Sequence, residues 1–156
     1  MKLKWKPLVF FLAVPLVVGT LSALLTGSNM ADFASLVKPP LSPPGWLFPV
    51  VWTILYLMMG LASYLIYTSG APRSERITAL GVYAIQLAVN FFWSIIFFRM
   101  ELYLFAFFWL ILLWLLILDT LILFRRISQP AGWLLLPYLL WVAFAGYLNL
   151  GIFLLN

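Results

Sequence analysis

The chain contains neither cysteine nor histidine, and it has few charged residues. Without cysteine it forms no disulfide and performs no thiol chemistry. Without histidine it has no imidazole for a zinc site, a catalytic triad or a proton relay. Its four carboxylates lie far apart in the sequence, and no two of them have helical or metal-ligand spacing. We therefore expect no bound metal and no required cofactor.

Hydrophobic residues are as abundant as charges are scarce. Of the 156 residues, 66% are hydrophobic and 8% are charged, with a mean hydropathy of +1.13. A soluble domain of this length needs far more charge to cover its surface, so the sequence predicts an integral membrane protein. A transmembrane β-barrel is the alternative fold, but barrel strands alternate apolar and polar residues, whereas these runs are apolar on every side.

The apolar runs predict an all-α membrane protein, a bundle of five transmembrane helices in a single domain over residues 1–156, because one span needs about 20 apolar residues. The expected spans are residues 7–26, 46–68, 74–98, 102–124 and 131–155, with a loop over residues 27–45. Pro137 lies inside the last span and should kink it. The lysines before the first span resemble the start of a signal peptide. Cleavage near Leu21–Ala23 stays an alternative, although the run is long enough to cross a membrane.

The positive charges are divided unequally between the two ends of such a bundle. One side has three lysines near the N-terminus, two arginines in the second loop and two in the fourth, seven in all, whereas the other side has only Lys38 and Arg99. The positive-inside rule then places the N-terminus in the cytoplasm. We interpret the placement of these charges as a signal of membrane topology and not as a nucleic-acid-binding surface. The expected partners are therefore membrane lipids and not nucleic acid.

The segment from Lys38 to Trp52 is rich in proline and aromatic residues. Its five prolines prevent a helix from continuing through it, because each proline fixes φ and lacks an amide donor. We expect a rigid loop that leads into the first turn of the second span. Trp46, Phe48 and Trp52 would lie at the membrane surface. A stiff, aromatic lid of this kind indicates a flat, apolar ligand beneath it.

Three sets of residues recur at helical spacing inside the spans. They are Phe48, Trp52 and Tyr56 in the second span, Gln86, Asn90 and Trp93 in the third, and Trp141, Ala145 and Leu148 in the last. An unsatisfied amide is costly in hydrocarbon, so Gln86 and Asn90 should face the bundle interior or a cavity. The same positions also fit ordinary helix packing, in which amides bond a neighbouring helix and small residues allow close approach.

Taken together, four segments resemble the translocator protein family, also called the tryptophan-rich sensory proteins or the peripheral-type benzodiazepine receptor family. They are Lys38–Trp46 (KPPLSPPGW), Pro49–Tyr56 (PVVWTILY), Gln86–Asn90 (QLAVN) with Trp93 and Phe97–Phe98, and Pro137–Asn149 (PYLLWVAFAGYLN). The segments occur in the family's order and spacing, and they span most of the chain.

The resemblance implies five transmembrane helices, a homodimer, and a pocket under the first loop that binds porphyrins and synthetic isoquinoline or benzodiazepine ligands. Trp52 and Trp141 match the two pocket tryptophans, which in some bacterial members are tied to light-dependent breakdown of protoporphyrin IX. The other pocket positions that the family implies are Phe33, Pro43, Pro44, Phe48, Tyr56, Asn90, Trp93, Ser94, Ala145 and Leu148. The missing basic tail and transit peptide favour a bacterial member in the cell membrane.

Two departures from the family pattern limit what the resemblance implies. Trp109 occupies the place in the fourth helix where the family usually has an acidic residue. Leu150 replaces the tyrosine of the cholesterol-recognition segment found in animal members, and no basic residue follows it. We therefore do not predict cholesterol transport.

Four functions stay open at this point, and the fourth is a purely structural or regulatory role. The first is a membrane receptor that binds or senses tetrapyrroles, with protoporphyrin IX as the expected ligand and Lys38 as the only cation near its propionates. Because no histidine or cysteine supplies a strong axial ligand, metal-free porphyrin is favoured over haem. The second is a light-dependent enzyme in which Trp52 and Trp141 degrade the porphyrin. The third is a transporter, although the chain lacks the inverted repeats and buried ion pairs of an alternating-access carrier.

Overall fold

Long apolar helices form almost all of the chain. The computed structural model describes residues 2–156, and within that range the secondary structure is entirely helical. The elements are α1 (Trp5–Thr26), η1 (Gly27–Asn29), α2 (Met30–Ala34), α3 (Leu47–Tyr67), α4 (Arg73–Ser94), η2 (Ile95–Arg99, a π-helical turn), α5 (Tyr103–Ile127), α6 (Gln129–Leu134) and α7 (Leu136–Leu155). Five helices of the described chain are long and apolar enough to cross a membrane, which confirms the predicted all-α fold.

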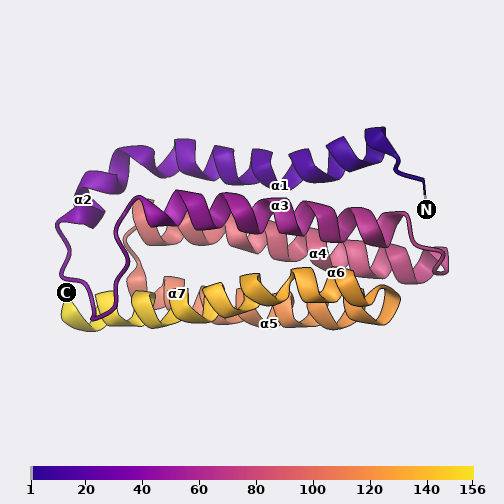
Figure 1. Cartoon of the computed structure of the whole chain (residues 1–156). Coiled ribbons are helices and arrows are strands. Elements are labelled where there is room, and N and C mark those ends of the chain that lie inside the picture. Colours follow the sequence, from indigo (N-terminus) through magenta and orange to yellow (C-terminus); the bar gives the residue numbers. More distant parts are fainter. Residues whose placement is uncertain (1) are drawn as a thin grey trace.

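The long helices lie side by side and run the length of the molecule (Figure 1). Helix α1 packs mainly against α3, α4 packs against α5, and α5 packs against α6 and α7. The N-terminus, the α3–α4 turn and the α5–α6 turn share one end, and the C-terminus, α2 and the loop after it share the other (Figure 1). The seven cations counted from the sequence therefore lie at one end of the bundle.

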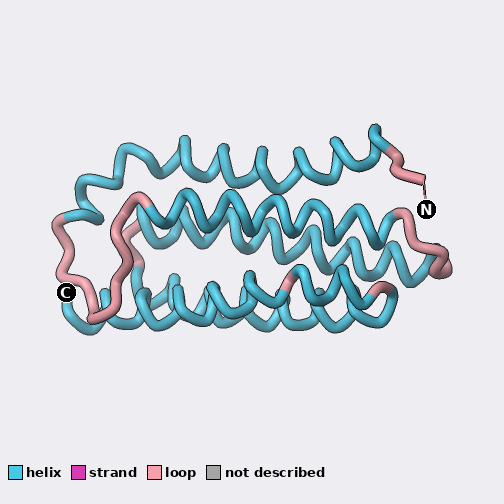
Figure 2. The backbone as a smooth tube through the Cα atoms, in the orientation of Figure 1, coloured by secondary structure: helices cyan, strands magenta, loops and turns pink. Residues whose placement is uncertain are grey.

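The first loop contains more helix than the sequence predicts. Residues 27–45 were expected to form a loop, but η1 and α2 occupy Gly27–Ala34. The side chain of Lys38 stabilises α2, because its ammonium lies 3.3 Å from the carbonyl oxygens of Phe33 and Ala34 at the helix end. Between α2 and α3, residues 35–46 are non-helical, and we call this segment the lid. It crosses one end of the bundle beside the C-terminus (Figure 2).

The last span is broken near its proline, as predicted. Helix α6 ends at Leu134, and α7 begins at Leu136 with Pro137 in its first turn. A proline is tolerated there because the first amides of a helix have no partner within the helix. The break leaves α6 and α7 as two consecutive segments of one span.

Candidate functional site

The lid is held on the C-terminal half of α7 by side-chain contacts to its backbone. The Asn156 amide nitrogen donates to the Val37 carbonyl (2.8 Å), and the Val37 N–H donates to the Asn156 Oδ1 (3.0 Å). The Tyr147 hydroxyl donates to the Pro40 carbonyl (2.7 Å). We call Tyr147, Gly151 and Asn156 the latch.

Gly151 belongs to the latch because of its size. A Cβ at this position would lie 2.5 Å from the Cγ of Pro39, which is closer than real Cβ contacts allow. The rigid ring of Pro39 is buried, so the absence of a side chain at Gly151 lets the lid lie directly on α7. The closed lid also contains strain, since Leu41 has a φ of 70° in the left-handed region that favours glycine.

A small apolar space lies directly beneath the lid. Its volume is about 40 Å³, and it is lined by Phe33, Lys38, Ser42, Pro43, Gly45, Phe48, Leu148 and Ile152. Four of the residues implied by the family, Phe33, Pro43, Phe48 and Leu148, are thus brought together. Ligand pockets usually measure about 300–1,000 Å³, so the closed lid leaves no room for a large ring.

A cluster of aromatic rings lies next to the space under the lid, on the side of α4. Trp93 stacks on Phe97 with ring centroids 5.2 Å apart, and Phe33 meets the edges of Phe97 and Phe98 at 5.9 and 5.2 Å. The Trp93 indole N–H donates to the Asn149 Oδ1 (3.1 Å), so the polar edge of the ring is satisfied. These contacts hold the indole plane within 26° of the Phe97 ring, a stacked arrangement.

A chain of buried hydrogen bonds links α3, α4 and α7 below this cluster. The Tyr56 hydroxyl donates to Asn90 Oδ1 (3.2 Å), and Asn90 Nδ2 donates to the Tyr138 hydroxyl (2.6 Å). The Tyr138 hydroxyl then donates to Gln86 Oε1 (2.8 Å). Both amides therefore face the bundle interior, as predicted, and they bond residues of neighbouring helices. Among the described residues the Gln86 amide nitrogen has no partner.

The two tryptophans singled out by the resemblance lie in different aromatic groups. Trp52 stacks on Tyr56 at 5.6 Å and meets the edge of Tyr138 at 6.1 Å. Trp141 instead contacts Phe48 at 5.9 Å and Phe144 at 5.6 Å. Each indole is thus packed against its own partners, and a ring inserted between the two would have to displace them.

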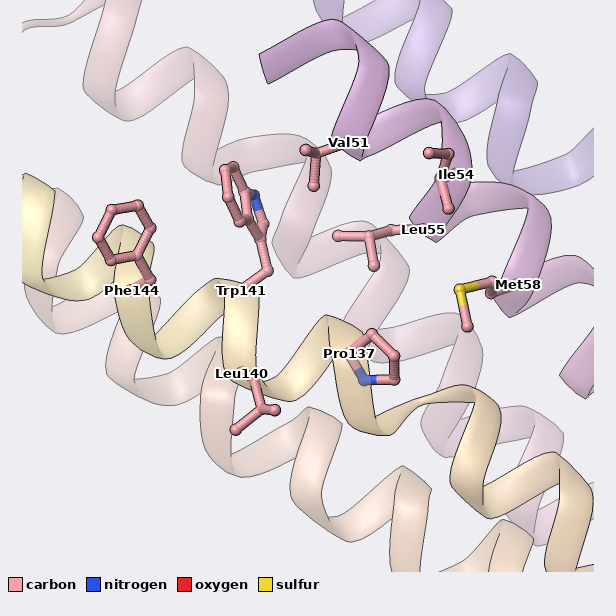
Figure 3. Close-up of a pocket in the computed structure, with 8 residues that line it drawn as sticks. All are labelled: Val51, Ile54, Leu55, Met58, Pro137, Leu140, Trp141 and Phe144. Atoms are coloured by element: carbon pink, nitrogen blue, oxygen red, sulfur yellow. The ribbon is translucent and has the colours of Figure 1, made fainter. Parts of the chain in front are cut away.

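A second, larger opening is a groove between α3 and α7 (Figure 3). Its volume is about 410 Å³, and it is lined by Val51, Ile54, Leu55, Met58, Pro137, Leu140, Trp141 and Phe144. Trp141 reaches from α7 toward Val51 on α3, so it forms one wall of the groove (Figure 3). Every lining side chain is apolar apart from the indole N–H.

Some predicted site residues lie outside these cavities, and some site residues were missed. Seven of the predicted residues line neither cavity: Pro44, Trp52, Tyr56, Asn90, Trp93, Ser94 and Ala145. Trp52, Tyr56, Trp93 and Ala145 instead pack in or against the main core. Sequence reasoning missed Tyr138 and the latch. Tyr138 could have been found, because it lies three residues before Trp141 and seven before Ala145, on the same face of the helix. No comparable signal marks Asn156, the last residue of the chain.

An all-helical bundle with five membrane-spanning helices, a proline-rich lid and an aromatic interior defines a multi-pass integral membrane protein. Comparison with known proteins identifies the family: residues 11–155 match the TspO/MBR family, and the chain belongs to it. The predicted family is therefore confirmed.

The chain is similar to named members from bacteria, animals and archaea. It is 46% identical over 124 residues to the Tryptophan-rich protein TspO of Chlorobaculum tepidum, covering 80% of this chain and 78% of that one. It is 41% identical over 147 residues to the Translocator protein of Ovis aries, covering 93% of this chain and 87% of that one. It is 35% identical over 150 residues to the Tryptophan-rich protein TspO of Archaeoglobus fulgidus, covering 96% of each chain.

Proposed function

We propose that this protein is a membrane receptor for porphyrins, with protoporphyrin IX as its ligand, and that the ligand binds between the lid and the Tyr56–Asn90–Tyr138 hydrogen bonds. The observation that carries the proposal is the aromatic lining of this region. The faces of Phe48, Trp52 and Trp93 come from two helices, and Phe33 and Pro43 close the region from above. Flat apolar rings stack favourably on such faces.

Binding requires the lid to move, because a space of about 40 Å³ does not admit a macrocycle. The closed lid is attached through a few contacts and contains the strained Leu41, so opening it breaks little structure. The opened region would extend the space under the lid toward Trp52 and Ala145. The Tyr56–Asn90–Tyr138 hydrogen bonds would form its polar floor.

Lys38 supports a ligand with carboxylates at one edge. Lys38 lines the space under the lid, and its ammonium lies over the ring of Phe33, 4.9 Å from the centroid. The ammonium donates to two carbonyl oxygens of α2 at 3.3 Å and to the carbonyl oxygen of Leu36 in the lid at 3.4 Å. A propionate at this rim would replace neutral carbonyl partners with a charged one, which gives a stronger hydrogen bond.

A titration in the dark tests the proposal. Purified full-length protein in detergent is titrated with protoporphyrin IX while tryptophan fluorescence is followed, with Trp52→Phe and Trp141→Phe in parallel. We expect saturable quenching that weakens in both variants and is unchanged in Trp5→Phe, whose indole is 68% exposed at the other end. Linear quenching that is the same in every protein would mean that porphyrin only partitions into the micelle.

A second function, light-dependent degradation of the porphyrin, is favoured by the surroundings of Trp52. Its indole lies against Tyr56 and Tyr138, two oxidisable phenols with hydrogen-bonded hydroxyls. An excited porphyrin would take one electron from the indole, and oxygen would add to the resulting porphyrin radical anion. Return of the electron to the indole radical cation would leave the tryptophan unchanged and the macrocycle oxidised by one molecule of oxygen. The test is the loss of porphyrin absorbance under light, which should stop in a Trp52→Phe, Trp141→Phe double variant. Loss at an equal rate would mean ordinary photobleaching.

A further inference from the structure

An arginine and a tryptophan form a defined pair at the end of the bundle that contains the N-terminus. The Arg125 guanidinium lies over the Trp133 ring, 4.9 Å from its centroid, and both residues are exposed. Gly132 makes this geometry possible, because a Cβ there would lie 2.5 Å from the Cβ of Arg125 and 2.8 Å from its Cα. Helix α6 can therefore lie directly on the end of α5, which brings Trp133 beneath the guanidinium.

The charge of Arg125 is available to a partner outside the chain. The nearest acidic residue in the sequence is Asp119, six residues earlier, so it lies about 9 Å away along α5 and on a different side of the helix. Arg76, at the same end of the bundle, is used differently. Its guanidinium donates to the carbonyl oxygens of Tyr67 (2.9 Å) and Ala71 (3.1 Å) and so closes the α3–α4 turn.

Pro137, which lines the apolar groove between α3 and α7, follows Trp133 by four residues in the sequence. Within α7, Pro137, Trp141 and Phe144 follow one another at i, i+4 and i+7, which places them along one side of that helix, and Trp133 precedes them in α6. Pro137, Trp141 and Phe144 line the groove (Figure 3). At a rise of 1.5 Å per residue the run from Trp133 to Phe144 is about 16 Å long, which matches half of a hydrocarbon core of about 30 Å.

We infer that Arg125, Trp133 and the α3–α7 groove together form a site for one anionic membrane phospholipid from the leaflet at the N-terminal end of the bundle. The phosphate binds the Arg125 guanidinium beside Trp133. One acyl chain runs along the groove to Trp141 and Phe144. The groove suits a chain and not a porphyrin, because no charged side chain lines it and it lies at the depth of the acyl chains.

Native mass spectrometry of the full-length protein tests the inference. Detergent-solubilised protein is titrated with dioleoyl phosphatidylglycerol and, separately, with dioleoyl phosphatidylcholine. We expect one phosphatidylglycerol to bind more tightly than phosphatidylcholine. Arg125→Gln should weaken that binding about fivefold, the effect of one basic residue near an anionic surface. Arg73→Gln is the matched control, since Arg73 is exposed at the same end. Its affinity should stay at the wild-type value.

A second variant tests the groove. Ile54→Trp places an indole in the groove from α3, and Leu140→Trp does so from α7. Both positions are more than half exposed, so folding should tolerate the larger side chain. Each should weaken phosphatidylglycerol binding at least fivefold, and inorganic phosphate should not compete. Equal weakening by Arg125→Gln and Arg73→Gln would overturn the inference. Full phosphatidylglycerol binding in both groove variants would also overturn it, because the headgroup would then bind without an acyl chain in the groove. Competition by inorganic phosphate would overturn it for the same reason.

Discussion

The latch makes a quantitative prediction about how often the lid opens. Asn156→Ala removes the two hydrogen bonds to the Val37 backbone. A neutral hydrogen bond contributes about 0.5–1.5 kcal/mol, and the exposure of this pair favours the lower half of that range, so the loss is about 1–2 kcal/mol. At 1.4 kcal/mol per factor of ten, the open fraction should rise about 5–30-fold. Tyr147→Phe removes one bond, to Pro40, so the open fraction should rise about 2–5-fold.

The absence of cysteine allows a direct assay of lid opening. Leu148 is 8% exposed and lines the space under the lid, so Leu148→Cys introduces a single thiol that a charged, membrane-impermeant reagent reaches only when the lid opens. The labelling rate then reports the open fraction. It should rise by the stated factors when Asn156→Ala or Tyr147→Phe is added, and Tyr67→Phe at the opposite end should leave it unchanged. Equal labelling rates in all four proteins would show that the latch does not hold the lid.

Three further substitutions follow from the packing. Tyr138→Phe removes two hydrogen bonds and leaves the Asn90 amide nitrogen and the Gln86 carbonyl buried without this partner, so the free energy of unfolding should fall by about 1–3 kcal/mol. A stability unchanged in denaturant titration would refute that reasoning. Gly60→Ala would place a Cβ 2.7 Å from the carbonyl oxygen of Phe11, so α1 must move away from α3, with a loss of about 1–3 kcal/mol. Gly81→Ala is its control, because a Cβ there meets nothing within 4 Å. Ala145→Phe should fill the interior beside Trp141 and abolish porphyrin binding, and an unchanged affinity in the dark titration would place the ligand elsewhere.

The fold was predictable because its main signals are long and redundant. Five apolar runs, each far longer than a buried soluble helix needs, can only be satisfied by helices that cross a membrane. The break at Pro137 was predictable for a similarly local reason. The short helix α2 was not, because its end depends on a contact from Lys38 in the following loop and not on a capping residue within the helix.

Only some residues of the candidate site, and little of their arrangement, could be predicted from the sequence. Helical spacing placed Phe48, Trp52 and Tyr56 on one face, and their contacts with α4 and α7 follow from it. Spacing along one helix does not say which residue of another helix it meets. The separate aromatic groups of Trp52 and Trp141, and the pairing of Asn156 with Val37 across 119 residues, are products of tertiary packing.

One engineered cross-link tests most directly whether porphyrin enters beneath the lid. A Cβ at Gly151 would lie 2.6 Å from the Cβ of Pro39, within about 1.2 Å of the mean disulfide separation of about 3.8 Å, so a small shift of the lid allows Pro39→Cys and Gly151→Cys to join. No other thiol competes. We predict that the oxidised double variant does not bind protoporphyrin IX in the dark titration and that a reductant restores binding. Equal binding before and after reduction would contradict entry beneath the lid.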